Sequence, residues 1–181
     1  MGHQFSVAPW TTGLKIVSFV GSLALLFGGV LAYRAIPDPG GFTHWFGLCI
    51  SLSLPAVLVG CLFFVVTGYT VEGTDLYVNR LVTRTRIPLE GIGKAWHGGT
   101  VCKGSLRVFG NGGLFSFTGI YRNAALGTYR LYATDFSKAV VLQLPDRVVV
   151  ITPASPEGFL EFMHHFFPST QAKPASPAAH S

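Results

Sequence analysis

The chain has 181 residues, of which 49% are hydrophobic and 12% charged, and its formal net charge is +5 at pH 7. A soluble protein of this length with so few charged residues is not expected to bury two long apolar helices, which bears on the two apolar runs described next. The three cysteines, Cys49, Cys61 and Cys102, are scattered, which excludes a disulfide framework and zinc-ligand spacing.

Two long apolar runs occupy the front of the chain. The first, Ile16 to Tyr33, contains no charged residue, and the second lies in a charge-free window from Pro39 to Val71. A helix rises about 1.5 Å per residue, so about 20 apolar residues cross a hydrocarbon core of about 30 Å. We therefore expect transmembrane helices at about 14–33 and 46–67. Aromatic residues that favour the headgroup layer lie near the four helix ends: Trp10, Tyr33, Trp45 and Tyr69.

A short turn between the runs makes them a helical hairpin, because residues 36–41 carry two prolines and two glycines. A cleaved signal peptide is the competing interpretation of the first run. Its apolar stretch is long for a signal peptide, its start lacks a basic cluster, and residues 32–35 have the wrong spacing for cleavage. The second helix would hold the chain at the membrane in either case.

The positive charges predict the orientation of the hairpin. Arg34 and Asp38 balance in the connecting loop, whereas Arg80, Arg84 and Arg86 follow the second helix. Short cytoplasmic segments are the ones that carry excess Lys and Arg. We therefore expect both termini in the cytoplasm, with residues 1–13 as an N-terminal cytoplasmic segment and the loop outside.

The second half is predicted to form short strands and then one helix. Ser155 and Pro156 are typical of a helix start, and Phe159, Phe162, Met163 and Phe166 form one apolar stripe. Residues 168–181, rich in Pro, Ala and Ser, are expected to be disordered. The expected strands alternate in polarity or flank turn residues: Asp75–Arg80, Val82–Pro88, Gly91–His97, Ser105–Phe109, Gly127–Thr134, Lys138–Leu144 and Arg147–Thr152.

Three segments of this half resemble bacterial pleckstrin-homology (PH) domains, in particular a membrane-anchored branch. They are Thr83–Ile92, with its Arg-Ile-Pro-Leu element, Gly110–Phe115, and Tyr121–Thr134. About seven short strands followed by one amphipathic helix predict a small barrel at 70–167 that the last helix caps, so with the hairpin we expect an α+β membrane protein. The resemblance implies that this barrel is PH-like and that the chain is anchored in the bacterial inner membrane. Residues 117–119 depart from the usual pattern of the loop. Function does not follow, because PH-like folds host many roles.

The domain is basic over residues 80–130, which contain eight Lys or Arg residues and the single acid Glu90. A basic face beside a membrane attracts anionic lipid headgroups. The alternative is that these charges only keep the domain soluble. The candidate lipid contacts are Arg84, Arg86, Lys103, Arg107 and Arg122.

The glycine-rich stretch Phe109–Gly119 is predicted to be a mobile loop. It lacks the spacing of a phosphate-binding loop, and no helix opens after it. Its residues are candidates for dipping into the membrane interface or binding a partner protein, and packing onto the barrel is the alternative. They are Gly110, Asn111, Gly112, Gly113, Leu114, Phe115 and Phe117.

No catalytic, cofactor or metal site is expected. His97 and Cys102 lack an obvious orienting acid, and His164 and His165 point to different helix faces. No nucleic-acid recognition motif is present. The sequence therefore predicts a non-catalytic membrane-tethered binding or scaffolding module that contacts a partner protein, an anionic lipid surface, or both. A membrane-surface hydrolase or transferase is the alternative.

Overall fold

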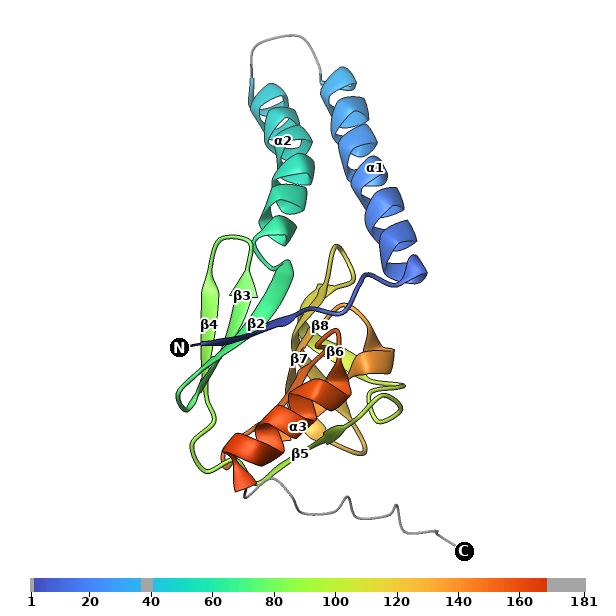
Figure 1. The fold of residues 1–181 in the computed structure, drawn as a ribbon. Helices are drawn as coiled ribbons and strands as arrows, with labels where there is room; N and C mark the ends of the chain where they lie inside the picture. The colour runs from blue at the N-terminus through green and yellow to red at the C-terminus, as the bar shows by residue number, and fades with distance from the viewer. Residues whose placement is uncertain (1, 37–40, 169–181) are drawn as a thin grey trace, which may run out of the picture.

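The computed structural model describes residues 2–36 and 41–168. Two long helices stand on one end of a β-rich domain, and a shorter helix packs on that domain (Figure 1). The centre of the connecting loop, and nearly all of the tail expected to be disordered, lie outside the described residues.

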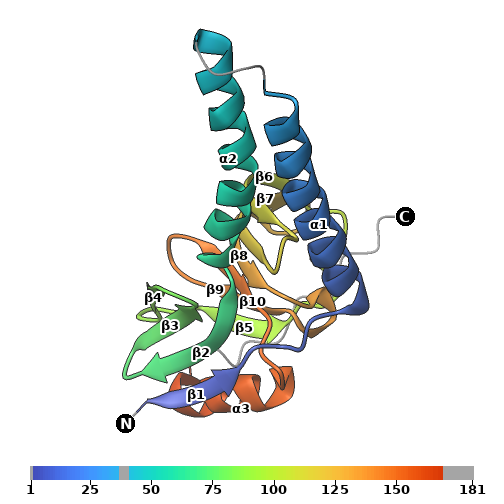
Figure 2. The ribbon, with the colours of Figure 1, turned by 90° about the horizontal axis from the view of Figure 1, so that it is seen from above.

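The two long helices are α1 (Thr12–Arg34) and α2 (Phe42–Leu62), which lie side by side (Figure 2). Both are long and apolar enough to cross a membrane, as judged by length and composition. The hydroxyl of Thr11 caps α1 by accepting a hydrogen bond from the Leu14 N–H at 3.2 Å. The expected span 46–67 was wrong at both ends. The chain leaves the helix at Leu62 because residues from Val66 onward pair in a sheet.

The first sheet has the order β1-β2-β3-β4, and all its neighbours are antiparallel. Its first strand comes from the N-terminal segment, which we had expected only to precede the anchor. The 1–13 segment thus contributes to the domain, since β1 pairs with β2 along its whole length. The strands are β1 (His3–Ser6), β2 (Val66–Glu72), β3 (Asp75–Arg80) and β4 (Arg84–Pro88).

The second sheet has the order β5-β9-β10-β8-β7-β6, in which only β8 and β10 run parallel. A short 3₁₀ helix, η1 (Phe136–Lys138), precedes β9. The expectation of about seven strands in one barrel is corrected: ten strands divide between two sheets in the described residues. The strands are β5 (Lys94–His97), β6 (Leu106–Gly112), β7 (Phe117–Asn123), β8 (Gly127–Ala133), β9 (Val140–Gln143) and β10 (Val148–Ile151).

The third helix, α3 (Pro156–Phe166), begins where predicted, with Ser155 as its N-cap. Phe159 and Met163 are fully buried in a core cluster that draws residues from both sheets. The ring of Phe5, on β1, meets that of Phe159 edge-on at 4.9 Å. The helix therefore closes the core between the sheets, and the N-terminal strand packs against it.

Tyr69 ties the two sheets together inside this core. Its hydroxyl donates to the carbonyl of Tyr132 at 2.8 Å and accepts from the Thr152 N–H at 3.1 Å. Burial raises the pKa of Tyr69 to about 12, because the phenolate would have to form away from water.

Candidate functional site

The two long helices join the domain at the same end and through short connectors. Residues 7–11 link β1 to α1, and residues 63–65 link α2 to β2. Val7 also forms a bridge with Pro153, and the Ala8 N–H donates to the Thr152 carbonyl at 2.8 Å. The domain is therefore held directly below the helices, with the β6–β7 hairpin beside them (Figure 2).

The tip of the β6–β7 hairpin binds the side of α1. The Ser18 hydroxyl accepts from the Phe115 N–H at 2.8 Å and donates to the Gly113 carbonyl at 3.4 Å. Leu114 packs at Gly21, where an added Cβ would lie 2.9 Å from its Cδ1 atom. Ser18 lies six residues above Thr12, so the tip reaches about 9 Å along the helix.

The tip also satisfies its own backbone polar groups. The Asn111 side chain accepts from the Leu114 N–H at 3.0 Å and donates to the Leu114 carbonyl. Ser116 donates to the carbonyl of Phe64, just beyond α2, at 2.9 Å. Phe115 has a φ of +68°, which is rare for a bulky residue. This strained turn is held by contacts with both long helices or their ends.

The glycine-rich stretch is a β-hairpin and not the loop that we expected. Gly110 pairs with Gly119 across the hairpin, with φ values of +116° and +142°. An added Cβ would lie 2.2 Å from the Thr118 carbonyl oxygen or 2.1 Å from that of Phe109, so the strands approach too closely for any side chain. Phe117 packs on Phe136, and both partly buried rings lie against the core of the second sheet.

The predicted loop residues therefore divide by position. Gly110, Asn111 and Gly112 lie in β6, whereas Gly113, Leu114 and Phe115 form the tip that contacts α1.

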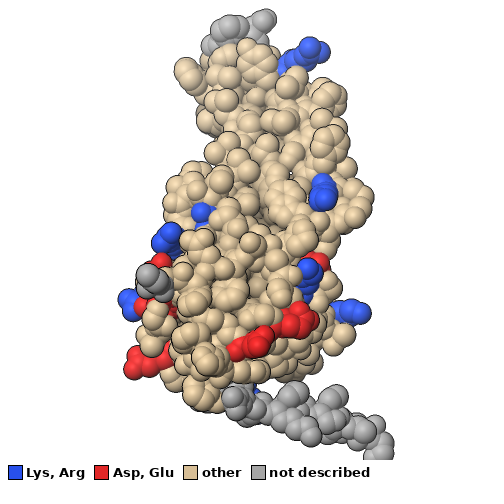
Figure 3. Space-filling view, in the orientation of Figure 1, with Lys and Arg blue, Asp and Glu red and all other residues tan. Residues whose placement is uncertain are grey.

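Large apolar side chains are exposed at the helix end of the domain. Leu81 and Val82, in the β3–β4 turn, are 59% and 61% exposed, and the Leu81 N–H donates to Val65 just after α2. On the face drawn in Figure 3, acidic side chains occur only over the β-domain, and the helices are almost bare of charge. Further exposed apolar residues of the domain and its α2 connector are Phe63, Phe64, Leu106, Val108 and Phe109.

The structure divides the predicted lipid-contact residues among three places. Arg84 and Arg86 lie on β4, where Arg86 forms an ion pair with Asp75 at 2.8 Å, which raises the pKa of Arg86. Arg122 is exposed on β7. Lys103 and Arg107 line one hollow, so these two are brought together.

That hollow has a volume of about 480 Å³ and also contains Cys102 and Ser105. Burial raises the pKa of the Cys102 thiol, which favours the protonated and less nucleophilic form. Ser105 accepts from the Tyr129 hydroxyl at 2.6 Å and donates to the Cys102 carbonyl at 2.7 Å. These polar groups therefore have partners within the chain.

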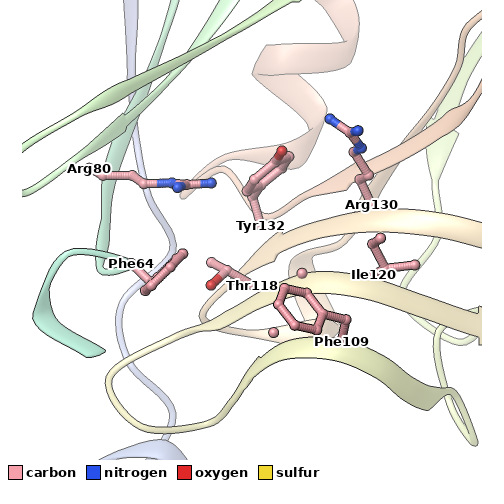
Figure 4. A pocket seen from close by; sticks show the side chains of 9 residues that line it. Phe64, Arg80, Phe109, Thr118, Ile120, Arg130 and Tyr132 are labelled. Carbon is pink, nitrogen blue, oxygen red and sulfur yellow. The ribbon is translucent and has the colours of Figure 1, made fainter. Parts of the chain in front are cut away.

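A second pocket contains residues that the sequence analysis counted only as basic or did not single out. Arg80 and Arg130 line it together with the aromatic residues Phe64, Phe109 and Tyr132 (Figure 4). Arg80 is the last residue of β3, and Thr118 and Tyr132 come from neighbouring strands of the other sheet. No local pattern brings these residues together, because the pocket forms where the sheets meet.

No group of three or more His, Cys, Asp or Glu side chains in the described part of the chain could hold a metal ion.

The comparisons with known proteins identify the domain. The family model described as bacterial PH domain matches residues 67–165, which is more than half of the chain. The protein therefore belongs to the bacterial PH domain family, as the resemblance had implied. Comparison with curated proteins gives no match, and comparison with solved structures gives none either.

Proposed function

We propose that this protein is a non-catalytic, membrane-tethered binding module whose PH domain contacts the anionic lipid surface at the cytoplasmic face of a bacterial membrane. The observation that carries the proposal is the junction. Both apolar helices meet the domain at one end, and the β6–β7 tip packs along α1 at Ser18 and Gly21.

The surface of the helices supports a lipid environment. Phe19, Phe27 and Leu52 are 71%, 62% and 66% exposed, so the apolar runs are not buried against the rest of the chain. A contiguous apolar surface of this kind marks an interaction site or a membrane contact. Hydrocarbon matches it along the whole length of both helices.

The hairpin tip is suited to the interface between headgroups and hydrocarbon. Backbone polar groups that enter the hydrocarbon need partners within the protein. Ser18 and Asn111 supply partners for Gly113, Leu114 and Phe115. This packing disfavours the tip as the docking site for a partner protein, because α1 already occupies one side of it.

The charges beside this end favour contact with anionic lipid. Arg84 follows the apolar β3–β4 turn and is exposed, and the exposed Arg107 donates to the Gly110 carbonyl of the hairpin at 3.2 Å. Each Lys or Arg near an anionic leaflet contributes about 1 kcal/mol. Arg86 contributes less because Asp75 already pairs with it.

The orientation is tested with reporter fusions to the full chain. A fusion after Ser181 should be active only as a cytoplasmic reporter, and an insertion at Gly40 only as an external one. The opposite pattern would contradict the cytoplasmic placement, because the positive charges would then lie on the wrong side.

Lipid contact is tested with the full chain in nanodiscs of neutral lipid and of neutral lipid mixed with anionic lipid. Hydrogen exchange of the β3–β4 turn should slow in the anionic discs, and added salt should reduce the difference because exposed charges are screened. Arg84→Gln combined with Arg107→Gln should remove the difference. Arg147→Gln, in the turn before β10, is the matched control. Equal exchange in both kinds of disc would refute the lipid contact.

A further inference from the structure

The pocket between the two sheets lies at the helix end of the domain. It has a volume of about 160 Å³, and one wall is Phe64, which follows α2 by two residues. Pockets that enclose a drug-sized ligand hold about 300 to 1,000 Å³. This pocket therefore has room for a small group and not for a large soluble ligand.

Arg80 brings an unneutralised charge to the pocket. Its guanidinium lies over the rings of Phe64 and Tyr132, at 5.5 and 5.4 Å from their centroids. Its Nε atom is buried without a hydrogen-bond partner, and within the described residues Arg80 makes no ion pair. A guanidinium placed in this way offers several N–H donors in a planar fork, which suits phosphate oxygens.

Thr118 provides a second unpartnered group. The residue is 1% exposed, and its Oγ1 atom has no hydrogen-bond partner among the residues that the structure describes. Figure 4 shows the hydroxyl between the rings of Phe64 and Phe109, with the Arg80 guanidinium extended toward Tyr132 above it. Buried hydroxyls without partners are rare because burial removes their bonds to water. Both groups are therefore explained together by a ligand that accepts hydrogen bonds.

The glycine pair forms the hairpin side of the pocket. Gly110 and Gly119 line it, and an added Cβ at either would lie within 2.2 Å of a carbonyl oxygen of the facing strand. The pocket is therefore lined by bare backbone beside Thr118. The exposed ring of Phe109 then forms an apolar rim.

We propose that this pocket binds the phosphate group of a single anionic phospholipid. Arg80 pairs with the phosphate oxygens and the Thr118 hydroxyl donates to one of them, while Phe64 and Phe109 contact the apolar part of the molecule. The proposal rests on the proposed function, which brings the pocket to the lipid surface. A soluble phosphate shares the headgroup's chemistry but leaves the aromatic rim without a partner.

The test uses the full chain in micelles of an uncharged detergent, with thermal unfolding and native mass spectrometry as readouts. Short-chain phosphatidylglycerol should raise the melting temperature and remain bound. Phosphatidylcholine of the same chain length, whose phosphate carries a bulky cationic substituent, should do so much less. Inorganic phosphate at the same concentration should have little effect, and a shift equal to that of the lipid would overturn the lipid assignment.

Variants distinguish binding in the pocket from nonspecific attraction of the lipid by positive charge. Arg80→Gln should weaken phosphatidylglycerol binding by about tenfold or more, because a charge-assisted hydrogen bond is lost. Thr118→Val has nearly the same shape, removes the unpartnered hydroxyl, and should weaken binding severalfold while the protein still folds. Arg147→Gln removes the same charge from an arginine paired with Asp146 and should bind like the wild type.

Equal lipid binding by the wild type, Arg80→Gln and Thr118→Val would overturn the proposal. If Arg80→Gln fails to fold, Thr118→Val alone decides. Phosphatidylglycerol is added at a low mole fraction, so that the micelle surface stays nearly uncharged. Absence of binding under this condition, with the nanodisc difference intact, would refute the pocket and leave the proposed function standing. The reverse pattern would refute surface contact and leave the pocket.

Discussion

In the β-domain most large apolar side chains are buried, whereas in the helical hairpin most of them are exposed. Tyr69, Leu131 and Phe159 are fully buried between the sheets. Along α1 and α2 the buried residues are Leu14, Ser18, Gly29 and Ser51, and all of them except Leu14 are small. The domain is therefore held together by removing apolar surface from water, and the hairpin by close backbone approach and hydrogen bonds between helices.

The largest effect should come from truncating the same residue type in the two regions. Phe159→Ala should lower the free energy of unfolding of the domain by about 3 to 5 kcal/mol, because it leaves a cavity in the core. Phe19→Ala removes a ring that is 71% exposed and should barely change it. Unfolding of the full chain in micelles, followed by hydrogen exchange of β2 and β8, measures both. If the two variants lose the same free energy of unfolding, the domain and the hairpin do not differ in the way described.

The second largest effect should be a loss of stability of the domain core at alkaline pH. The pKa of Tyr69 is about 12 in the folded protein against an ordinary value of about 10, so its stabilising contribution is complete below pH 10 and is lost as the pH rises to 12. A difference of about two pKa units corresponds to about 3 kcal/mol.

Denaturant titrations of the domain between pH 8 and pH 12 would measure how steeply the free energy of unfolding falls as the pH rises. Tyr69→Phe should make the fall less steep without abolishing it, because burial also raises the pKa of Tyr129 to about 12. The variant also loses the bonds to Tyr132 and Thr152. If the free energy of unfolding falls as steeply with pH in Tyr69→Phe as in the wild type, other groups cause the loss of stability at alkaline pH.

A smaller effect is expected at the contact between the two regions. Ser18→Ala leaves the Phe115 N–H and the Gly113 carbonyl without their partner and should cost about 1 to 3 kcal/mol of local stability. Ser22→Ala is the matched control, because that hydroxyl bonds only within α1, to Ser18. Hydrogen exchange at residues 113–117 should quicken in the first variant alone. The same rate in both would mean that the tip is held by its own turn.

The smallest effect is expected inside the hairpin. The Ser51 hydroxyl donates to the Gly29 carbonyl of the other helix at 2.9 Å, whereas Ser53 bonds only to Ile50 in its own helix. Ser51→Ala should weaken the helix pair by about 0.6 kcal/mol, the average for such bonds in membranes. Energy transfer between labels at the two helices should fall in Ser51→Ala and stay constant in Ser53→Ala. If Ser51→Ala costs more stability than Ser18→Ala, the bond between the two helices matters more than the contact of the hairpin tip with α1, contrary to the order proposed.

The sequence predicted elements whose signal is local. The long apolar runs, the capped start of α3 and the strand pairs around short turns follow from run length, capping and period-two alternation. The family was also visible, since the Arg-Ile-Pro-Leu element and the glycine-rich segments both lie in the matched region. The lipid contacts predicted for the basic residues stay a prediction, and the division of these residues among three places was not visible along the chain.

Tertiary structure decided where distant segments meet. Ser18 and Gly113 are 95 residues apart, and β1 pairs with a strand beyond both long helices. The pocket joins Arg80 to Thr118 across two sheets. Such contacts depend on sheet order and on how the sheets pack, which no pattern within one segment encodes. The sequence by itself thus determined the elements and which helices are apolar enough to cross a membrane. Only the packing of the elements decided that, among the described residues, an arginine Nε and a threonine hydroxyl would lie without partners near the end of one of those helices.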